Sequence, residues 1–330
     1  MMQQSVQNEI ILITGAAGSI GRELTLGLAK RNPKQLILVD FAETALHSLL
    51  LELKQAAPNT AIRYFIDSIC NEAFVAYLFN EFKVTTLIHA AAYKHVSMVE
   101  TNVCAAINTN FTGAKQILDK AIAHEVARFI FVSTDKAVNP QSVMGRTKKL
   151  FEMYALREQK QNPDIKIHIL RLCNVYGSSG SVVPLFEERI SKNQPLIIRG
   201  KESRRAFVQP GQLMPMLDVL MGGAASGVYI PKDYELLTVP EVAKRVLESF
   251  GINKEDYPLE YEPLFSSEKE NEELKASTEM ESTACTGSLV LVSNTKETLL
   301  DSALLQQCIR SAQSYRVKEA QSHLERLTSA

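Results

Sequence analysis

The stretch Thr14-Gly15-Ala16-Ala17-Gly18-Ser19-Ile20-Gly21 follows an apolar run at residues 10–14 and opens a helical pattern at Ser19. Glycines between a strand and a helix let the chain turn tightly and bring backbone N–H groups and the helix N-terminus onto a pyrophosphate. The alternative is a tight strand-to-helix turn that holds no ligand. The residues of this turn predicted to bind a dinucleotide are Gly15, Ala17, Gly18, Ser19, Ile20 and Gly21.

On the C-terminal side of this turn, short apolar runs alternate with stretches of helical periodicity as far as residue 172. Such alternation is typical of βαβ units around a parallel sheet. The fold class is therefore predicted to be α/β, with a doubly wound parallel sheet of the Rossmann type. The predicted strands are residues 10–14, 35–40, 61–66, 86–90, 128–133 and 166–172, and the predicted helices are residues 19–31, 42–55, 72–82, 105–124 and 145–161.

From about Gly177 the alternation loosens and Gly and Pro become frequent, which indicates a smaller substrate-covering region interleaved with the sheet. We predict a cofactor-binding domain at residues 1–176. Residues 177–330 are predicted to be mainly a substrate-binding region that ends in a C-terminal helix. Within it, residues 265–288 are rich in Ser, Thr and Glu and poor in aliphatic residues, so we expect a mobile loop or a surface insertion there.

The composition limits the possible functions. Among 330 residues, 45% are apolar and 36 Lys and Arg balance 37 Asp and Glu, so neither disorder nor a nucleic-acid partner is expected. The five cysteines, at 70, 104, 173, 285 and 308, form no CxxC pair, so we expect neither a metal site nor disulfides, and instead thiols in a reducing cytoplasm. Without a run of about 18 apolar residues or a basic leader, a soluble cytoplasmic protein is expected.

Asp40 ends the second predicted strand, roughly 20 residues beyond the glycines. A carboxylate there can accept both ribose hydroxyls and would repel a 2′-phosphate, so the sequence favours NAD over NADP. Asp67 ends the third strand and is predicted to meet the adenine, with an exposed turn carboxylate as the alternative. Ala90 and Ala91 offer small residues where a cofactor must pass closely, although packing alone would also explain them.

Four further stretches make the chain similar to a known group: His89–Val96, Ser133–Pro140, Met144–Lys148 and Asn174–Pro184. With the glycine spacing, they resemble the extended short-chain dehydrogenase/reductases, and more narrowly the bacterial polysaccharide-biosynthesis UDP-N-acetylglucosamine 4,6-dehydratases. The match covers about residues 9–250. It implies an NAD-dependent lyase that acts on a UDP-linked amino sugar for surface glycans. It also implies a homodimer or larger assembly through helices that flank the sheet.

In typical members of this superfamily a Tyr, four residues before a Lys, deprotonates the sugar hydroxyl, and here the Tyr position is Met144. A thioether has no proton to exchange, so Met144 is excluded as the base. Met at this catalytic position resembles one branch of the dehydratase family. The resemblance assigns Lys148 to the nicotinamide ribose, whereas the plain alternative is a solvated helical lysine.

In that branch the catalytic residues are Thr134, Asp135 and Lys136, which follow directly after a strand, at the edge where open α/β sheets build their sites. By resemblance, Lys136 removes the carbon 5 proton, Asp135 protonates the departing carbon 6 hydroxyl and Thr134 orients the carbon 4 oxygen. The alternative is an exposed Asp-Lys turn closed by Asn139-Pro140.

The substrate contacts implied by resemblance lie on several loops. Lys94 is expected near the phosphates or the acetamido sugar. Asn174 and the loop that contains Ser181 are expected to grip the nucleotide. Arg204 or Arg205 lies where the family keeps an Arg for the pyrophosphate, with surface arginines as the alternative.

A family Arg-Pro-Gly-Glu-Lys stretch is replaced by Phe265-Ser-Ser-Glu-Lys269, with Glu272-Glu273-Leu274 behind it. The missing Arg leaves the exact substrate open. Two other hypotheses therefore stand beside the dehydratase. One is a nucleotide-sugar 4-epimerase or oxidoreductase, which normally needs the Tyr that Met144 replaces. The other is a catalytically silent NAD-binding regulatory protein, against which the intact Thr134-Asp135-Lys136 stands.

Overall fold

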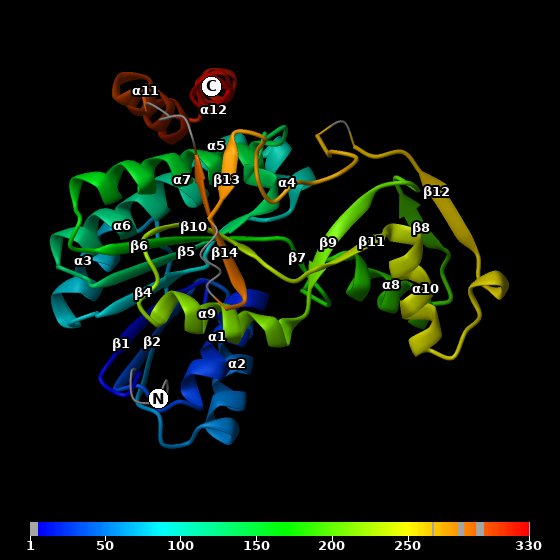
Figure 1. Ribbon diagram of the computed structural model, residues 1–330, viewed down its shortest axis with the longest axis horizontal. Coiled ribbons are helices and arrows are strands. Elements are labelled where there is room, and N and C mark those ends of the chain that lie inside the picture. The colour runs from blue at the N-terminus through cyan, green and yellow to red at the C-terminus, as the bar shows by residue number, and fades with distance from the viewer. Residues whose placement is uncertain (1–5, 266, 283–286, 295–299, 330) are drawn as a thin grey trace.

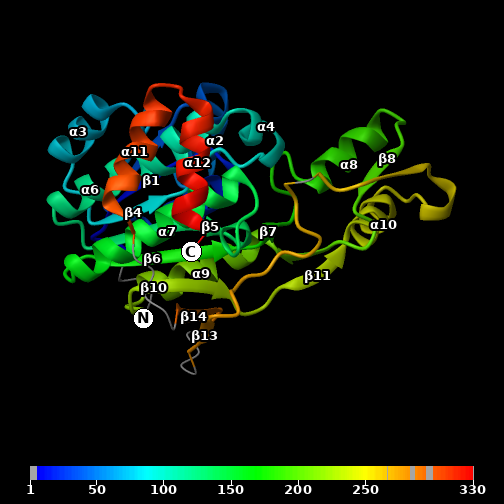
Figure 2. The same cartoon turned by 90° about the horizontal axis from the view of Figure 1, so that it is seen from above.

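The computed structural model describes residues 6–265, 267–282, 287–294 and 300–329. Helices cover both faces of a large sheet, and a smaller lobe lies to one side of it (Figure 1). The same two lobes are separate when the molecule is seen from above (Figure 2). Across the ranges described, none of the helices combines the length and the apolar character needed to span a bilayer.

The large sheet contains strands from both halves of the chain. Its strands are β1 (Ile10–Thr14), β2 (Gln35–Asp40), β3 (Ile62–Ile66), β4 (Thr86–His89), β5 (Arg128–Thr134), β6 (Lys166–Leu172), β10 (Gly227–Pro231), β13 (Glu279–Glu281) and β14 (Leu289–Asn294). The helices around it are α1 (Ser19–Ala29), α2 (Glu43–Ala56), α3 (Glu72–Glu81), α4 (Val96–Thr101), α5 (Val103–Ala106), α6 (Ala114–Ala123), α7 (Val143–Gln161), α9 (Leu213–Met221), α11 (Ser302–Gln313) and α12 (Val317–Thr328). Shorter helical segments are the π-helix η2 (Ile107–Gly113) and the 3-10 turns η3 (Asp135–Ala137) and η4 (Pro210–Gln212).

The strand order in this sheet is β13-β14-β10-β6-β5-β4-β1-β2-β3. Neighbours pair in parallel, except that β14 is antiparallel to both β10 and β13. The order reverses at β1, which lies between β2 and β4. In a doubly wound sheet, ligands bind at such a switch point, outside the carboxyl ends of the strands. The predicted α/β fold with a doubly wound sheet is confirmed.

The central strands explain why the sheet forms. Ile11, Leu12 and Ile13 of β1 are fully buried, because helices cover both faces and leave no side for polar residues. Strands β2, β4 and β5 are buried along nearly their whole length as well. The continuous apolar runs that predicted the strands are therefore the core of the large lobe.

The smaller lobe has a core of its own, formed around Phe186, Ile198 and Val242. It contains a three-stranded sheet, β11-β9-β7, and a two-stranded parallel sheet, β12-β8. Its elements are β7 (Asn174–Val175), α8 (Val182–Ser191), β8 (Leu196–Arg199), β9 (Arg204–Val208), β11 (Glu235–Thr238), α10 (Val239–Ser249), η5 (Lys254–Asp256) and β12 (Leu259–Glu262).

Two segments differ from the sequence predictions. The helix predicted at residues 105–124 is α5, η2 and α6 in succession, with a π-helical turn that no periodicity revealed. Residues 265–288 were expected to be a mobile loop or a surface insertion. In their described part Leu274 and Glu279 are buried, and β13 joins the edge of the large sheet. Glu279 of this part pairs with the buried Arg171, a contact that composition alone does not reveal.

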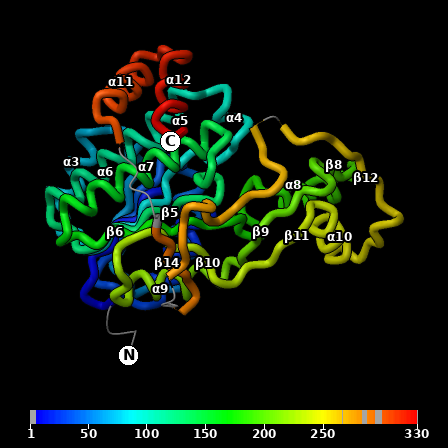
Figure 3. Tube along the Cα trace, turned by 45° about the horizontal axis from the view of Figure 1, so that its top comes forward, coloured from blue at the N-terminus to red at the C-terminus, as the bar shows by residue number. Residues whose placement is uncertain are grey.

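We predicted one C-terminal helix, whereas the structure contains two helices there, α11 and α12. Helices α11 and α12 pack on each other, and α12 packs on α7 and α5. The pair lies over the helical layer that contains α5 and α7 (Figure 3). The apolar side chains Leu304, Leu305 and Leu324 face inward and are buried.

Candidate active site

The glycine turn lies at the carboxyl end of β1, at the switch point of the sheet. Gly15 has a φ of +68°, and a Cβ there would lie 2.5 Å from the backbone nitrogen of Ala91. A Cβ on Gly21 would lie 2.0 Å from the carbonyl oxygen of Gly15. Both positions therefore require glycine, one for the turn and the other for the approach of α1 to the turn.

The N-terminus of α1 fits an anionic ligand. Gly18 is its N-cap and has no side chain that could cap the helix, so the first backbone N–H groups of α1 donate no hydrogen bond to an N-cap side chain. A Cβ added to Gly18 would meet only the Gly15 carbonyl oxygen, at 3.4 Å. The start of α1 therefore combines open space at Gly18, backbone N–H donors and the positive end of the helix dipole.

Asp40 fixes the glycine turn. Its Oδ2 accepts a hydrogen bond from the Ala17 N–H at 2.9 Å, and its Oδ1 accepts one from the Ala42 N–H at 2.9 Å. Asp67 accepts hydrogen bonds from the Ser68 N–H and the Asn71 amide, so it caps the turn before α3. Its role toward adenine stays a prediction. Ala90 and Ala91, whose backbone packs against Gly15, close the other side of the turn.

The Thr134-Asp135-Lys136 turn lies two strands away from β1, at the carboxyl end of β5. Thr134 Oγ1 donates to Asp135 Oδ1 at 2.8 Å, and Lys136 Nζ donates to the same oxygen at 3.0 Å. The Asp135 side chain is only 2% exposed, and its Oδ2 is buried without a hydrogen-bond partner among the described residues. Gly145 of α7 makes this arrangement possible, because a Cβ there would lie 2.2 Å from the Lys136 carbonyl oxygen.

Two charged residues from the C-terminal half, Glu272 and Lys269, lie next to this turn. Glu272 Oε1 lies 3.8 Å from Lys136 Nζ, and Glu272 Oε2 lies 3.5 Å from Lys269 Nζ. Burial alone would lower the pKa of Lys136, but the carboxylates of Asp135 and Glu272 raise it above its ordinary value. Lys136 is therefore protonated at neutral pH in this arrangement. Neither Glu272 nor Lys269 was predicted as a site residue, although both lie in the stretch that resembles the family's Arg-Pro-Gly-Glu-Lys and Glu-Glu-Leu motifs.

Met144 and Lys148 lie on the buried side of α7. Met144 is 4% exposed, and its thioether has no acid–base role. Lys148 Nζ donates to the Val132 carbonyl oxygen at 2.9 Å and lies 4.5 Å from the centre of the Phe131 ring. Burial lowers the pKa of Lys148 to about 7. The structure thus excludes the alternative of a solvated helical lysine.

A buried ion network lies next to the Thr134-Asp135-Lys136 turn. The Arg171 guanidinium binds both carboxylate oxygens of Glu152 and both of Glu279, with distances of 2.7 to 3.1 Å. Glu152 Oε1 also accepts a hydrogen bond from Ser133 Oγ, the residue before Thr134, at 2.6 Å. Charge within an otherwise apolar strand was the signal that could have revealed Arg171 as a paired residue.

Among the predicted substrate residues, Lys94 and the loop that contains Ser181 come from the two halves of the chain and lie close together. Lys94 Nζ donates to the Ser179 carbonyl oxygen, and Ser19 Oγ accepts from the Ser179 N–H at 2.9 Å. The loop that contains Ser181 is thus joined to the glycine turn. Burial lowers the pKa of Lys94, and Ser181 Oγ is buried without a partner among the described residues.

Two of the other predicted substrate-binding residues, Asn174 and Arg205, donate hydrogen bonds to backbone carbonyl oxygens. Asn174 Nδ2 donates to the Ala206 carbonyl oxygen at 3.1 Å. Arg205 donates to the carbonyl oxygens of Lys269 and Glu270, so its guanidinium lies against the segment that contains Glu272. Arg204 is exposed on β9. Arg205 is therefore the one of the two arginines that the structure brings near the acid–base turn.

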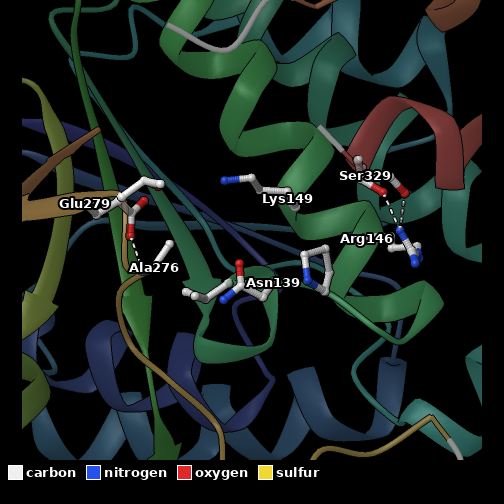
Figure 4. Close-up of a pocket in the computed structure, with 10 residues that line it drawn as sticks. Asn139, Arg146, Lys149, Ala276, Glu279 and Ser329 are labelled. Carbon is white, nitrogen blue, oxygen red and sulfur yellow. Dashed lines mark hydrogen bonds between the residues drawn. The ribbon is translucent and has the colours of Figure 1, made fainter. Parts of the chain in front are cut away.

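A separate cavity of about 370 Å³ lies beside this site (Figure 4). Asn139, Arg146 and Lys149 line it together with Ala276 and Glu279. Arg146 donates to Thr328 and Ser329 at the end of α12. Since Thr134, Asp135 and Lys136 do not line it, the cavity is not the space in which the acid–base residues would act.

Among the described residues, the cysteines form no disulfide bond. Cys70, Cys104, Cys173 and Cys308 are free thiols, and Cys285 lies outside the described residues. Burial raises the pKa of Cys173 to about 12, with Asp135 adding to the effect. No group of three or more His, Cys, Asp or Glu side chains within the described ranges is placed to hold a metal ion.

A Rossmann sheet, a glycine turn at its switch point and an Asp-Lys pair after β5 define a protein of the extended short-chain dehydrogenase/reductase type. The chain belongs to the polysaccharide biosynthesis protein family, whose model matches residues 11–294. It is 34% identical to the capsular polysaccharide biosynthesis protein CapD of Staphylococcus aureus over 83% of this chain and 46% of CapD. The chain therefore spans about half the length of this relative.

Shorter or weaker matches include relatives with enzyme names. A UDP-N-acetylglucosamine 4,6-dehydratase (inverting) of Campylobacter jejuni is 35% identical over 55% of this chain and 54% of its own. A UDP-glucose 4-epimerase of Rickettsia felis is 29% identical over 83% of this chain and 79% of its own. Among solved structures, Pen from Bacillus thuringiensis matches with a TM-score of 0.75 and 28% identity, over 82% of this chain and 84% of its own.

Proposed function

We propose that this protein is an NAD-dependent nucleotide-sugar 4,6-dehydratase that acts on a UDP-linked N-acetylhexosamine. The observation that carries the proposal is the hydrogen bond between the half-buried Lys136 and the buried Asp135 at the carboxyl end of β5. A 4-epimerase needs only oxidation and reduction at carbon 4, whereas elimination of water needs a further acid and base. Met144 in place of the usual Tyr also favours a reaction that depends on the Asp-Lys pair.

The residues present fit NAD. The uncapped start of α1 and the open space at Gly18 suit a pyrophosphate, and Asp40 lies where ribose hydroxyls would bind. Asp67, Ala90, Ala91 and Lys148 are the further residues proposed to contact the cofactor. When bound, NAD would supply the oxidation at carbon 4 and the later reduction at carbon 6 that a 4,6-dehydratase requires.

The chain's own residues would carry out the elimination. A proton that moves from Lys136 Nζ to Asp135 Oδ1 along their 3.0 Å hydrogen bond produces a neutral amine and a protonated carboxyl together. The amine then takes the carbon 5 proton, and the electrons of that C–H bond form the carbon 5–carbon 6 double bond. Asp135 gives its proton to the carbon 6 hydroxyl, which leaves as water. Thr134 would hold the carbon 4 oxygen.

The substrate would lie between the lobes. Lys94, Asn174, Ser181 and Arg205 are the residues proposed to bind its nucleotide and phosphates, since they supply ammonium, amide, hydroxyl and guanidinium donors from both sides. Arg204, exposed on the same strand as Arg205, is the weaker candidate for a phosphate contact. We also propose, by family resemblance, that the protein acts in the cytoplasm as a homodimer or larger assembly.

Isotope transfer tests the proposal. UDP-N-acetylglucosamine deuterated at carbon 4 should give a product that has lost one water, contains deuterium at carbon 6 and has solvent hydrogen at carbon 5, without accumulation of reduced cofactor. Mass spectrometry and NMR of the product measure all three. Deuterium returned to carbon 4 would indicate an epimerase. Label released in reduced cofactor would indicate a simple dehydrogenase, and no reaction with cofactor still bound would favour a silent regulatory protein.

A further inference from the structure

Residues 267–282, here called the crossing segment, run from the side of the smaller lobe to β13 at the edge of the large sheet (Figure 1), and Glu272 of this segment contacts Lys136. One end is held where Arg205 donates to the carbonyl oxygens of Lys269 and Glu270, at 2.8 and 2.6 Å. The other end is held where Arg171 binds the Leu274 carbonyl oxygen and the Glu279 carboxylate. Glu272 lies between these two anchors.

The anchors place Glu272 against Lys136. The Glu272 side chain is 5% exposed, and its Oε1 lies 3.8 Å from Lys136 Nζ. Its Oε2 has no hydrogen-bond partner among the described residues, although Lys269 Nζ lies 3.5 Å away. Asp135, Lys136, Glu272 and Lys269 therefore form a row of alternating charges. Burial of a carboxylate to this degree costs free energy unless a nearby cation stabilises its charge.

Building on the proposed dehydratase activity, we propose that Glu272 is a positioning residue whose carboxylate stabilises the positive charge that develops on Lys136 as this side chain takes the carbon 5 proton. In the elimination Lys136 changes from a neutral amine to an ammonium. A fixed carboxylate at 3.8 Å lowers the free energy of the charged form without reorganisation during the step. Glu272 thereby makes Lys136 a stronger base.

The charges that face Lys136 come from three directions. Asp135 on the same turn and Glu272 on the crossing segment favour the ammonium, whereas Arg205 on β9 opposes it. Cys173 remains a neutral thiol near neutral pH, because burial raises its pKa. Lys269 faces Glu272 and partly neutralises it. Removal of Glu272 and removal of Lys269 should therefore change the proton affinity of Lys136 in opposite directions.

The test measures Lys136 directly and does not depend on turnover. Acetylation of Lys136 by acetic anhydride is followed across pH by peptide mass spectrometry, and the midpoint reports its titration. Glu272→Gln should move this midpoint down by about one pH unit or more, and Lys269→Gln should move it up. The matched control Glu270→Gln removes the same charge from an exposed side chain two residues away and should leave it in place.

Turnover is the second measurement. Glu272→Gln should lower dehydration of UDP-N-acetylglucosamine about 10-fold or more, with partial rescue by Glu272→Asp. An unchanged Lys136 midpoint in Glu272→Gln, or an equal shift in Glu270→Gln, would overturn the proposal. If Glu272→Gln does not fold, as judged by circular dichroism, an unchanged midpoint in Lys269→Gln overturns it instead. Absence of dehydration by the unaltered protein would refute the proposed function and leave the titration result standing.

Discussion

Lys136 Nζ donates a hydrogen bond to Asp135 Oδ1 at 3.0 Å, and the position of the proton in this bond decides what the pair can do. With the proton on Lys136 the pair is ionic, and with the proton on Asp135 it is an acid beside a base. Asp135→Asn and Lys136→Ala should each reduce turnover on the order of 100-fold or more while cofactor affinity stays nearly unchanged. Steady-state kinetics measures turnover, and calorimetry measures cofactor affinity. Lys149→Ala, which changes a lysine outside the Asp135–Lys136 pair, is the control and should keep full turnover. Full activity in Asp135→Asn or in Lys136→Ala would refute the roles assigned to these residues.

Asp40 has two roles that a single substitution can separate. Its carboxylate holds the glycine turn through the Ala17 N–H, and it should also exclude a 2′-phosphate. Asp40→Ala should therefore weaken NAD binding and narrow the gap between NAD and NADP. Calorimetric titration with both cofactors measures this. Tighter binding of NADP than of NAD by the unaltered protein would contradict the assignment.

At the scale of elements, Arg171 joins three parts of the fold: β6, which contains it, α7 through Glu152 and β13 through Glu279. Arg171→Ala would leave two carboxylates buried without their cation, and should cost about 3–5 kcal/mol of unfolding free energy. Urea denaturation measures the loss. Arg22→Ala breaks a half-exposed ion pair with Glu52 and should cost about 1 kcal/mol or less. Equal losses in the two variants would show that the network is not what fixes β13.

At the scale of the whole molecule, two buried histidines make the large sheet sensitive to acid. His89 and His168 lie in β4 and β6, and burial lowers their pKa values to about 3 and about 4. The unfolded chain binds protons below about pH 6.5, whereas the folded chain does not, so stability falls as pH decreases from 6.5 toward 4. Each histidine should cost about 2 kcal/mol between pH 6.5 and 5.

Urea denaturation at several pH values measures this slope. His89→Gln should reduce this slope by about half, because the variant retains only His168 of the two buried histidines that gain a proton on unfolding. His47 is exposed, so His47→Gln should leave the slope unchanged. An identical slope in the unaltered protein and in His89→Gln would contradict the assignment of the acid sensitivity to the sheet.

The sequence by itself determined the doubly wound sheet and the glycine turn. Strands such as Ile10–Thr14 are runs of apolar residues, and their burial on both faces follows from local composition. It also placed Asp135 and Lys136 at the carboxyl end of a strand, because their position depends only on where that strand stops. The family resemblance supplied their proposed roles.

Only the tertiary structure decided which distant charges meet. Glu272 reaches Lys136 from 136 positions away, and Glu279 reaches Arg171 from 108 positions away. The composition of residues 265–288 predicted a loop, because polar residues lower the apolar content whether or not they are paired. A buried ion pair is stable only when both partners lose water together, so its existence depends on the fold that brings them into contact. No local periodicity carries that information.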